Sequence, residues 1–571
     1  VYFFFFYAPP PQTESRALPY SIIKTAEALS ESVPASFGAI LFSLLPPEIQ
    51  NGDVFPATFA DNHDSKSEFS VSVLTASKED RYLTYKRRIR EAFAHRGSVV
   101  FVSPTNEGVI QASEKLLTGI ADRSVVLSSA LPKRALKKAY GEAADLSVAK
   151  VIITTPSRAL IDRPDITDVI IDESGSSHFK ARSRPYLSLK DVILLHSRLS
   201  GRRVLLGDLV HSAKDELLRR QDVYLTEDEE PHRINLSSQL VVVEQKDRTS
   251  SDIPFQLFSD ELLEVIATTV KEKKNVFLYS ARRGISPVVA CGDCGHIFRC
   301  PDSGAPYSLF RTMKNGEERR WFLSPTSGRR VRAADICPEC GSWKLRERGI
   351  GIQHIHDELK KHFPEDKLFL FDHITASTRI KAHSIVGDFY DSKGGILIGT
   401  AMALPYLEKP VTISAVVSLD AVRSAPTWRV DKACFYLLMK LREITLDRLF
   451  VQTRTEPDEL LTLASSGSTE RFFNEELKLR EDLRYPPFYN LIHLTMVGPL
   501  ESVRVLEEGV VKKLAPFDFS FYSGPESTTN KTIRYGLCRV PTGKWPDREL
   551  IEALKILPPS VRVEIDPDKI V

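Results

Sequence analysis

The chain has 571 residues, of which 42% are hydrophobic and 27% charged, and its formal net charge is +2. The length predicts about three to five structural units, and the composition is ordinary for a soluble globular protein and too balanced to indicate a nucleic-acid-binding surface by itself. Seven cysteines in so long a chain, four of them in two CxxC pairs, exclude a secreted disulfide framework. They favour a metal site in a reducing compartment, and we expect a cytoplasmic protein.

The first residues, VYFFFFYAPPPQ, do not begin with methionine. Their aromatic run of about seven residues is too short to span a bilayer, and no basic segment typical of a signal peptide precedes it. No other run approaches transmembrane length, so we expect a soluble protein without membrane association. We interpret this start as the ragged edge of a truncated gene or as a partial hydrophobic segment, and the chain is expected to be truncated at this end.

The N-terminal part divides into a short helical segment and a polar one. Residues 1–50 contain the pattern SIIKTAEALSESVPASFGAILFSLLPPEI, which is typical of small helices. Residues 51–70 are polar without a clear period and predict a linker.

Residues 71–235 alternate short apolar runs with helical patterns of 12–15 residues. Because the runs are continuously apolar rather than alternating, they predict parallel strands covered on both faces. The predicted strands are 98–104, 123–129, 149–156, 168–174 and 202–208.

The same pattern returns in residues 236–470, so we predict two α/β lobes in tandem. The predicted strands of the second lobe are 275–282, 367–372, 394–400, 413–420 and 447–453. Residues 288–348, with most of the cysteines, interrupt this lobe after its first strand. Residues 471–571 open a separate C-terminal unit of mixed α and β character.

The two CxxC pairs are Cys291 with Cys294 and Cys337 with Cys340, separated by 42 residues. A CxxC turn directs both sulfurs toward one point, and Zn²⁺ prefers four such ligands in a tetrahedron. Ordinary buried cysteines are the alternative, but each pair is followed by glycine in a polar stretch. We therefore predict one bound zinc held by these four residues. Cys434 and Cys538 lie in apolar contexts and are expected to be core thiols.

The insertion 288–348 carries eleven Lys and Arg against seven Asp and Glu, a net charge of 11 − 7 = +4. It also contains aromatic residues, which are Tyr307, Phe310, Trp321 and Phe322. Such a module could contact a DNA backbone or stack on bases. A solvated charged surface with aromatics packed inside the module explains the pattern equally well.

The segments YSARRGISPVVACGDCGHIFRCPDSGAPYSLF and CPECGSWKLRERGIGIQHIHDELKKHFPEDKLFLFD resemble the primosomal protein N′ (PriA) family of replication-restart helicases. The resemblance extends over most of the chain, from ASFGAILFSLLPPEI, similar to the end of the family's winged-helix domain, to the closing IDPDKIV. It implies two RecA-like helicase lobes, a zinc-binding insertion, a winged-helix-like remnant and a C-terminal α+β domain. The family's DNA 3′-end-binding domain has no room in this sequence.

The family has eight cysteines and two zincs in this insertion. The resemblance implies that Cys291, Cys294, Cys337 and Cys340 are the outer ligand set. The inner set matches Cys300, Ser303, Ser324 and Ser327. Serine is a poor zinc ligand, and one thiolate does not hold a structural zinc, so a single metal is expected.

The ATPase motifs that the resemblance implies are altered at four places. The P-loop position, 71–85, has no glycine and places Glu79 and Asp80 where a triphosphate would lie. The DExH motif is DESG, which keeps Asp172 and Glu173, the pair that would hold Mg²⁺. The segments GDLVHS (207–212) and KLREITLD (440–447) replace a motif-III-like segment and the arginine-finger motif. The sequence thus predicts lost or weak ATP hydrolysis, without an ordinary site for ATP and Mg²⁺.

The leading hypothesis is a zinc-bearing DNA-binding protein of replication restart and primosome assembly. It would recognise branched or forked DNA, including single-strand/double-strand junctions, and recruit other replication-restart proteins. The first alternative is an active ATP-dependent 3′→5′ DNA helicase with an atypical nucleotide site, for which Asp172 and Glu173 are the catalytic candidates. The second is a zinc-stabilised scaffold for protein interactions.

Overall fold

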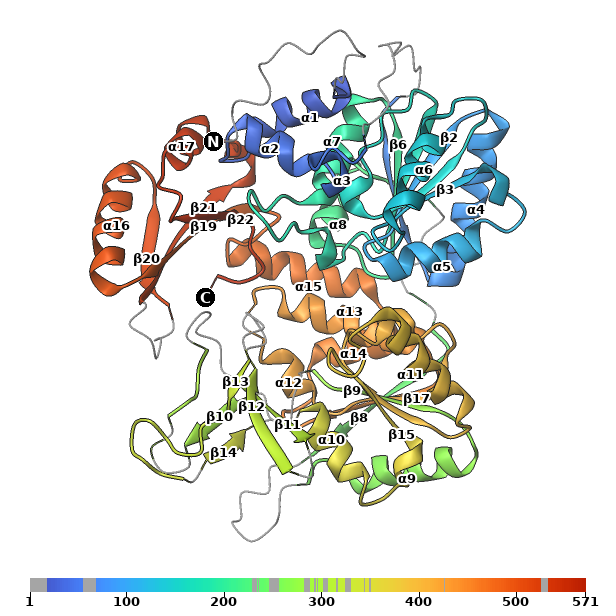
Figure 1. Ribbon diagram of the computed structural model, residues 1–571, viewed down its shortest axis with the longest axis vertical. Coiled ribbons are helices and arrows are strands. Elements are labelled where there is room, and N and C mark those ends of the chain that lie inside the picture. Colours follow the sequence, from blue (N-terminus) through green and yellow to red (C-terminus); the bar gives the residue numbers. More distant parts are fainter. Residues whose placement is uncertain are drawn as a thin grey trace. The chain divides into compact units, whose positions relative to one another are not determined.

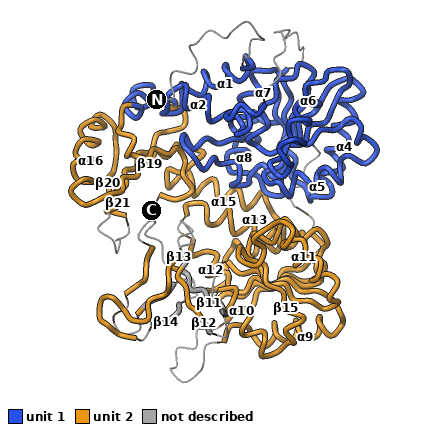
Figure 2. The backbone as a smooth tube through the Cα atoms, viewed as in Figure 1, with its two compact units in different colours: residues 1–230, 546–555 blue, residues 231–545, 556–571 orange. Residues whose placement is uncertain are grey.

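The computed structural model describes residues 18–54, 68–227, 234, 236–245, 256–281, 288–291, 294, 296–300, 307–314, 317–323, 330–343, 345–348, 351–425, 427–524 and 532–570. The chain forms two compact units, residues 1–230 with 546–555 and residues 231–545 with 556–571 (Figure 2). No helix within the described ranges combines the length and the apolar character that crossing a membrane requires.

The first unit contains a parallel sheet, of which Figure 1 labels β2, β3 and β6. The strand order is β3-β4-β2-β5-β6-β1-β7. Its strands are β1 (Val71–Thr75), β2 (Ser98–Val102), β3 (Ser124–Leu127), β4 (Val151–Thr154), β5 (Ile166–Asp172), β6 (Arg203–Asp208) and β7 (Leu225–Thr226). All five residues of β2 are buried, because helices cover both faces of the sheet. The five strands predicted for this lobe correspond to β2 to β6.

The helices of this lobe are α4 (Lys78–Ala94), α5 (Asn106–Leu116), α6 (Lys133–Ala144), α7 (Leu189–Leu199) and α8 (Ala213–Arg220). One face of the sheet packs on α4 and α5, where Tyr85 and Val109 are buried against Phe101. The other face packs on α7 through Ile193 and on α6 through Leu136. The carboxyl ends of the strands therefore lie at one edge of a sandwiched sheet.

In the described residues before β1 there are three helices, namely α1 (Tyr20–Ser30), α2 (Phe37–Leu44) and α3 (Pro47–Gln50). Ile22 and Ile40 are buried with Val192 of α7 in one apolar cluster, so this segment packs directly on the first lobe. No strand occurs among the described residues before β1, so the part predicted as a winged-helix-like remnant is helical where it is described.

The second unit contains a parallel sheet in the order β15-β16-β9-β17-β18-β8. Its strands are β8 (Gln239–Glu244), β9 (Val276–Tyr279), β15 (Leu368–Phe371), β16 (Ile396–Gly399), β17 (Val411–Val416) and β18 (Thr445–Thr453). The helices around it are α9 (Asp260–Lys271), α10 (Ile352–Leu359), α11 (Arg379–Asp391), α12 (Leu419–Arg423), α13 (Val430–Glu443), α14 (Glu459–Ser466) and α15 (Thr469–Asp482). The chain therefore has two parallel-sheet α/β lobes, as predicted.

A small antiparallel module interrupts the second lobe between β9 and α10. Its strands are β10 (Val288–Cys291), β11 (Ser308–Lys314), β12 (Glu317–Leu323), β13 (Arg330–Arg332) and β14 (Leu345–Arg348). β10 pairs with β14, and β11, β12 and β13 form a three-stranded sheet. The module has its own core, which includes Val289, Phe298 and Phe322.

The C-terminal part contains an antiparallel sheet in the order β20-β21-β19-β22. Its elements are β19 (Tyr489–Gly498), α16 (Leu500–Lys513), β20 (Phe519–Ser523), β21 (Thr532–Pro541), α17 (Arg548–Lys555) and β22 (Arg562–Ile565). Helices and antiparallel strands together give the α+β character expected from the sequence. The domain boundaries inferred from the sequence stay predictions.

Candidate metal centre, nucleotide site and nucleic-acid face

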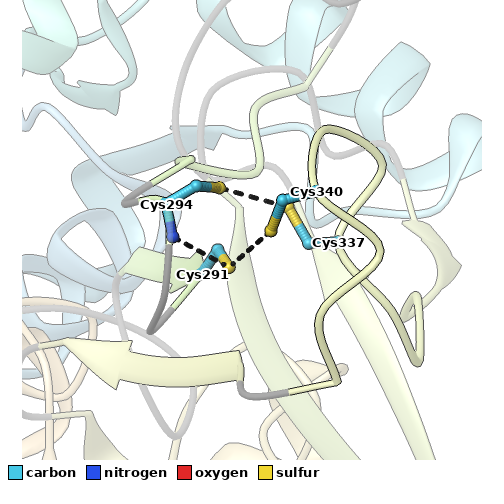
Figure 3. A group of neighbouring side chains, drawn as sticks. All are labelled: Cys291, Cys294, Cys337 and Cys340. Carbon is cyan, nitrogen blue, oxygen red and sulfur yellow. Dashed lines mark hydrogen bonds between the residues drawn. The ribbon is translucent and has the colours of Figure 1, made fainter.

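Four cysteines converge at one end of the inserted module (Figure 3). Cys291 ends β10, which pairs with β14 so that Cys291 lies opposite Leu345. This pairing brings the first CxxC turn beside the second one, which lies just before β14 in the chain. In the second turn the Gly341 N–H donates to the Cys337 carbonyl over 2.9 Å, and Gly341 adopts a positive φ of 71° that favours glycine.

The sulfur atoms of Cys291, Cys294, Cys337 and Cys340 all lie within 4.8 Å of one another. The Sγ atoms of Cys291 and Cys340 are 3.5 Å apart, and those of Cys294 and Cys337 are 3.6 Å apart. Tetrahedral zinc with Zn–S bonds of about 2.3 Å places its sulfurs about 3.8 Å apart. The four residues are therefore arranged as a possible metal site, and their thiol chemistry is the type that zinc prefers.

The ionisation of these thiols reflects their crowding. The backbone N–H of His296 lowers the pKa of the Cys294 thiol, but hydrogen bonds with the other thiols, led by Cys340, raise that pKa to about 12. The backbone N–H of Ser342 and the Cys294 thiol lower the pKa of Cys340, but Cys291, burial and Cys337 raise it above its usual value. Four thiols this close compete for the same hydrogen bonds, whereas a divalent cation would bind all four as thiolates.

Cys300 lies apart from this cluster. It is fully buried in the module core beside Phe298 and Tyr307. Ser303, Ser324 and Ser327, which the family resemblance aligns with the other inner ligands, lie outside the described residues. Cys434 and Cys538 are buried, in agreement with the expectation of core thiols.

The aromatic residues of the module divide into two groups. Tyr307 and Phe322 are buried, and their rings stack with centroids 5.3 Å apart, so these two residues pack the module. Trp321 is only half-buried. The side chain of Phe310 is not among those described. Sequence reasoning did not single out Trp343, whose side chain is 76% exposed beside Cys340.

The position expected for a P-loop is the turn between β1 and α4. Ser77 caps α4 by accepting the Asp80 N–H over 3.3 Å, and its own hydroxyl donates to the Asp80 carboxylate over 2.7 Å. Glu79 and Asp80 both lie in the first turn of the helix. The helix dipole favours anions at this end, and here two carboxylates of the chain itself take that position instead of a phosphate.

Asp172, the candidate ligand of Mg²⁺, is paired inside the first lobe. Its Oδ1 accepts a hydrogen bond from Arg81 Nε over 3.0 Å and another from the Tyr85 hydroxyl over 2.8 Å. Arg81 is fully buried and also donates to the Ala76 carbonyl over 2.8 Å. Burial raises the pKa of Asp172, with the Arg81 guanidinium acting in the opposite direction. The Arg81 guanidinium thus pairs with Oδ1 of the carboxylate that was the candidate metal ligand.

Gly207 makes this arrangement sterically possible. A Cβ atom at Gly207, on β6, would lie 1.7 Å from the hydroxyl of Tyr85, which is far too close. The absence of a side chain therefore lets Tyr85 reach Asp172 across the end of the sheet. No sequence signal identified Arg81 or Tyr85, because they meet Asp172 only through the tertiary fold.

Glu173 follows directly and adopts a positive φ of 48°. Its side chain is half-buried. The segment that follows Glu173 is hydrogen-bonded to the end of β6, where Asp208 Oδ2 accepts from the Gly175 N–H over 2.7 Å. Asp172 and Glu173 are therefore adjacent in sequence but differ in environment, and only Asp172 is fully enclosed.

Residues 440–447 of the second lobe correspond to the arginine-finger motif, and their charged side chains bind other groups of the same lobe. Lys440 Nζ pairs with Glu443 over 2.8 Å. The Arg442 guanidinium is buried and donates to the Ala464 carbonyl over 2.6 Å and the Ser238 carbonyl over 2.7 Å. These bonds tie α13 to its neighbours within the second lobe.

Hydroxyl and amide groups gather at the carboxyl ends of β2, β3 and β4, which are adjacent strands. Asn106 accepts from Ser128 Oγ over 2.8 Å and donates to Ser129 Oγ over 2.9 Å. Within the described part of the chain, the Thr155 hydroxyl at the end of β4 has no hydrogen-bond partner. We call this edge, with the exposed Arg134 and Lys137 of α6, the strand-end face.

Arg158 follows β4 but does not contribute to the strand-end face. Its guanidinium is buried and donates to both carboxylate oxygens of Glu48, over 2.7 and 2.9 Å. The Tyr140 hydroxyl donates to the same carboxylate over 2.8 Å. Helix α3 thus neutralises a cation that would otherwise lie near this edge.

Comparison with known proteins gives several sequence relatives that are replication restart proteins. Replication restart protein PriA of Bacillus subtilis is 26% identical over 368 residues, which cover 62% of this chain and 45% of that protein. PriA of Thermotoga maritima is 21% identical over 79% of this chain and 60% of its own length, and PriA of Synechocystis is 24% identical over 73% and 52%. The chain spans about half the length of the curated relatives it matches. No family model matches the sequence.

Similarity to solved structures is weaker. Dbp5 of S. cerevisiae bound to RNA and ADP BeF3 has a TM-score of 0.40 and 11% identity over 82% of this chain and 98% of its own. RecG bound to a three-way DNA junction has a TM-score of 0.40 and 13% identity over 81% of this chain and 47% of its own. Scores this low do not establish a common fold, so the relationship depends on the sequence matches.

Proposed function

We propose, because the chain is a divergent relative of the PriA replication restart proteins, that it is a zinc-bearing, DNA-binding protein of replication restart and primosome assembly whose ATP hydrolysis is lost or weak. The observation that carries the proposal is the buried pairing of Asp172 with Arg81 and Tyr85. Arg81 and Tyr85 both donate to Oδ1 of Asp172, so a buried guanidinium already pairs with the carboxylate that would ligate Mg²⁺. The turn before α4 offers carboxylates where phosphates would bind.

DNA binding is supported by the strand-end face. Single-stranded and duplex DNA both present phosphates, which bind hydroxyl and amide donors and lysine and arginine side chains. Arg134 and Lys137 are exposed on α6, the helix that follows the loop with Ser128 and Ser129 at the end of β3. In the proposed role the protein binds branched or forked DNA and recruits further restart proteins without translocating. The zinc site would keep the insertion folded.

Binding to a labelled DNA fork should be equally tight with and without ATP and Mg²⁺, and the affinity should fall as salt rises. Reversing two phosphate-contacting cations in the Arg134→Glu/Lys137→Glu variant should weaken binding about tenfold and reduce the salt slope by about 1.4 for a single strand. Fluorescence anisotropy between 50 and 200 mM salt, a range in which the phosphate term is large, measures both values.

The matched control for this variant is Arg90→Glu. Arg90 is an exposed arginine on α4, the helix that covers the opposite face of the same sheet. We expect it to leave the affinity nearly unchanged. Equal losses in both variants would show that only the overall charge matters and would remove the strand-end face from the proposal.

ATP with Mg²⁺ should leave the unfolding temperature of the protein unchanged. A nucleotide that bound the native state at 100 times its Kd would stabilise it by about 2.7 kcal/mol, which a thermal melt detects. DNA-stimulated ATP hydrolysis should also be absent. Nucleotide stabilisation together with turnover that disappears in the Asp172→Ala/Glu173→Ala variant would instead establish an active helicase.

A further inference from the structure

The strands β12 and β13, which Figure 1 labels in the inserted module, form an antiparallel ribbon. Its two faces differ in chemistry. Side chains alternate between the faces of a strand. Phe322 is buried in the module core, and its cross-strand partner Val331 packs against the same core. This apolar face covers the interior of the module.

The opposite face is basic and aromatic. Trp321 lies opposite Arg332 in the register, so these residues share a face with Arg330 and Arg319, each two positions away on its own strand. Arg319, Arg330 and Arg332 are exposed, and Trp321 is half-buried. We call Arg319, Trp321, Arg330 and Arg332 the arginine face.

Arg330 also orients the aromatic ring. Its guanidinium lies 4.3 Å from the centroid of Trp321, a cation–π contact. The stacked pair is already ordered, so a ligand that stacks on it loses little conformational freedom from the protein side. A planar aromatic group next to three cations matches a nucleobase attached to phosphates, since base–aromatic stacking and phosphate pairing recur at sites for single-stranded nucleic acid.

We propose that the arginine face binds single-stranded DNA, with Trp321 and Arg330 as the stacking platform and Arg319 and Arg332 as phosphate contacts. This inference rests on the proposed DNA-binding function and names a second contact surface for it, on the inserted module rather than on the first lobe. A duplex hides its bases, so the arginine face selects the single-stranded arm of a branched substrate.

The test uses the full-length, metal-containing protein and a fluorescein-labelled oligothymidylate of 20 nucleotides. Trp321→Ala should weaken binding about tenfold, whereas Trp321→Phe should retain most of the affinity, because stacking contributes strongly for each base. Arg319→Gln/Arg332→Gln should weaken binding and reduce the magnitude of the salt slope by about 1.4, since each lost phosphate contact removes roughly 0.7.

Arg320→Gln is the matched control. Arg320 lies on the same strand but alternates to the other face, where it pairs with Asp335 over 3.0 Å. It should leave affinity and slope unchanged. Each variant is taken as folded if its metal content and melting temperature equal those of the unmodified protein. If the double variant is not folded, the single variant Arg332→Gln, at an exposed position, is tested instead.

The outcomes separate the two proposals. If the unmodified protein binds the fork and the oligothymidylate but the Trp321 and arginine variants bind equally well, the arginine face is not a DNA contact and the proposed function stands. If the unmodified protein binds no DNA at all, both proposals fail. A loss of the same size in Arg320→Gln would attribute the effect to overall charge and overturn the arginine face.

Discussion

Replacing Cys337 with serine should abolish zinc binding and unfold the inserted module. Cys337 is almost completely buried, and its sulfur lies among the other three cysteine sulfurs. The module has only a small apolar core, whereas structural zinc contributes about 10–16 kcal/mol of apparent binding energy in small domains. Metal analysis of the unmodified protein should give about one zinc per chain, and the variant should contain none.

The matched control is Cys300→Ser, which changes a buried cysteine of the same module that lies outside the cluster. This variant should keep its zinc and lose only a modest amount of stability. Limited proteolysis should cut within residues 288–348 in the Cys337 variant and spare that range in the control. Two zincs per chain, or loss of zinc in the Cys300 variant, would show that Cys300 takes part in metal binding.

Replacing Asp172 with asparagine should destabilise the protein by about 3 kcal/mol, because it leaves the buried Arg81 guanidinium without a counter-charge. In a working motor the same change would remove a metal ligand and reduce turnover, while stability would change little. Adding Arg81→Met should recover much of the loss, since the second change removes the unpaired charge. Urea denaturation of the single and double variants measures the coupling between the two residues.

Glu173→Gln provides the comparison, because it alters the neighbouring carboxylate at a half-buried position. We expect a loss of less than about 1 kcal/mol. If Asp172→Asn were as mild as Glu173→Gln, the Arg81–Asp172 pair would not stabilise the lobe, and the interpretation of Asp172 as a structural residue would be wrong.

The strands that form the two parallel sheets were largely readable from the sequence. Runs such as residues 98–104 and 394–400 are continuously apolar because they are buried on both faces, and the structure places β2 and β16 there. β8 was not predicted. Gln239 and Glu244 at its ends are exposed and polar, so the strand lacks the continuous apolar run of the buried strands. The insertion strand β12 was also missed, because arginines on its outer face hide the apolar alternation.

The candidate sites were predictable only in part. The spacing of the two CxxC pairs identified all four residues of the cysteine cluster, because each knuckle is a local structure. Arg81 and Asp172 are 91 residues apart, and no local sequence pattern in either segment predicts that they form an ion pair. The strand-end face likewise depends on strand order, which brings together residues from three separate loops. Sites formed by residues close together in the sequence could be predicted from the sequence, whereas contacts between residues on different strands could be identified only from the structure.

The contact between Tyr85 and Gly207 has an evolutionary consequence. Tyr85 occupies the space that any larger residue at position 207 would need, and it also hydrogen-bonds Asp172. Arg81, Tyr85 and Gly207 therefore constrain one another, so that no single substitution frees Asp172 without leaving a charge or a cavity behind. If ATP hydrolysis is lost as proposed, restoring an accessible Asp172 therefore requires changes at several of these positions together.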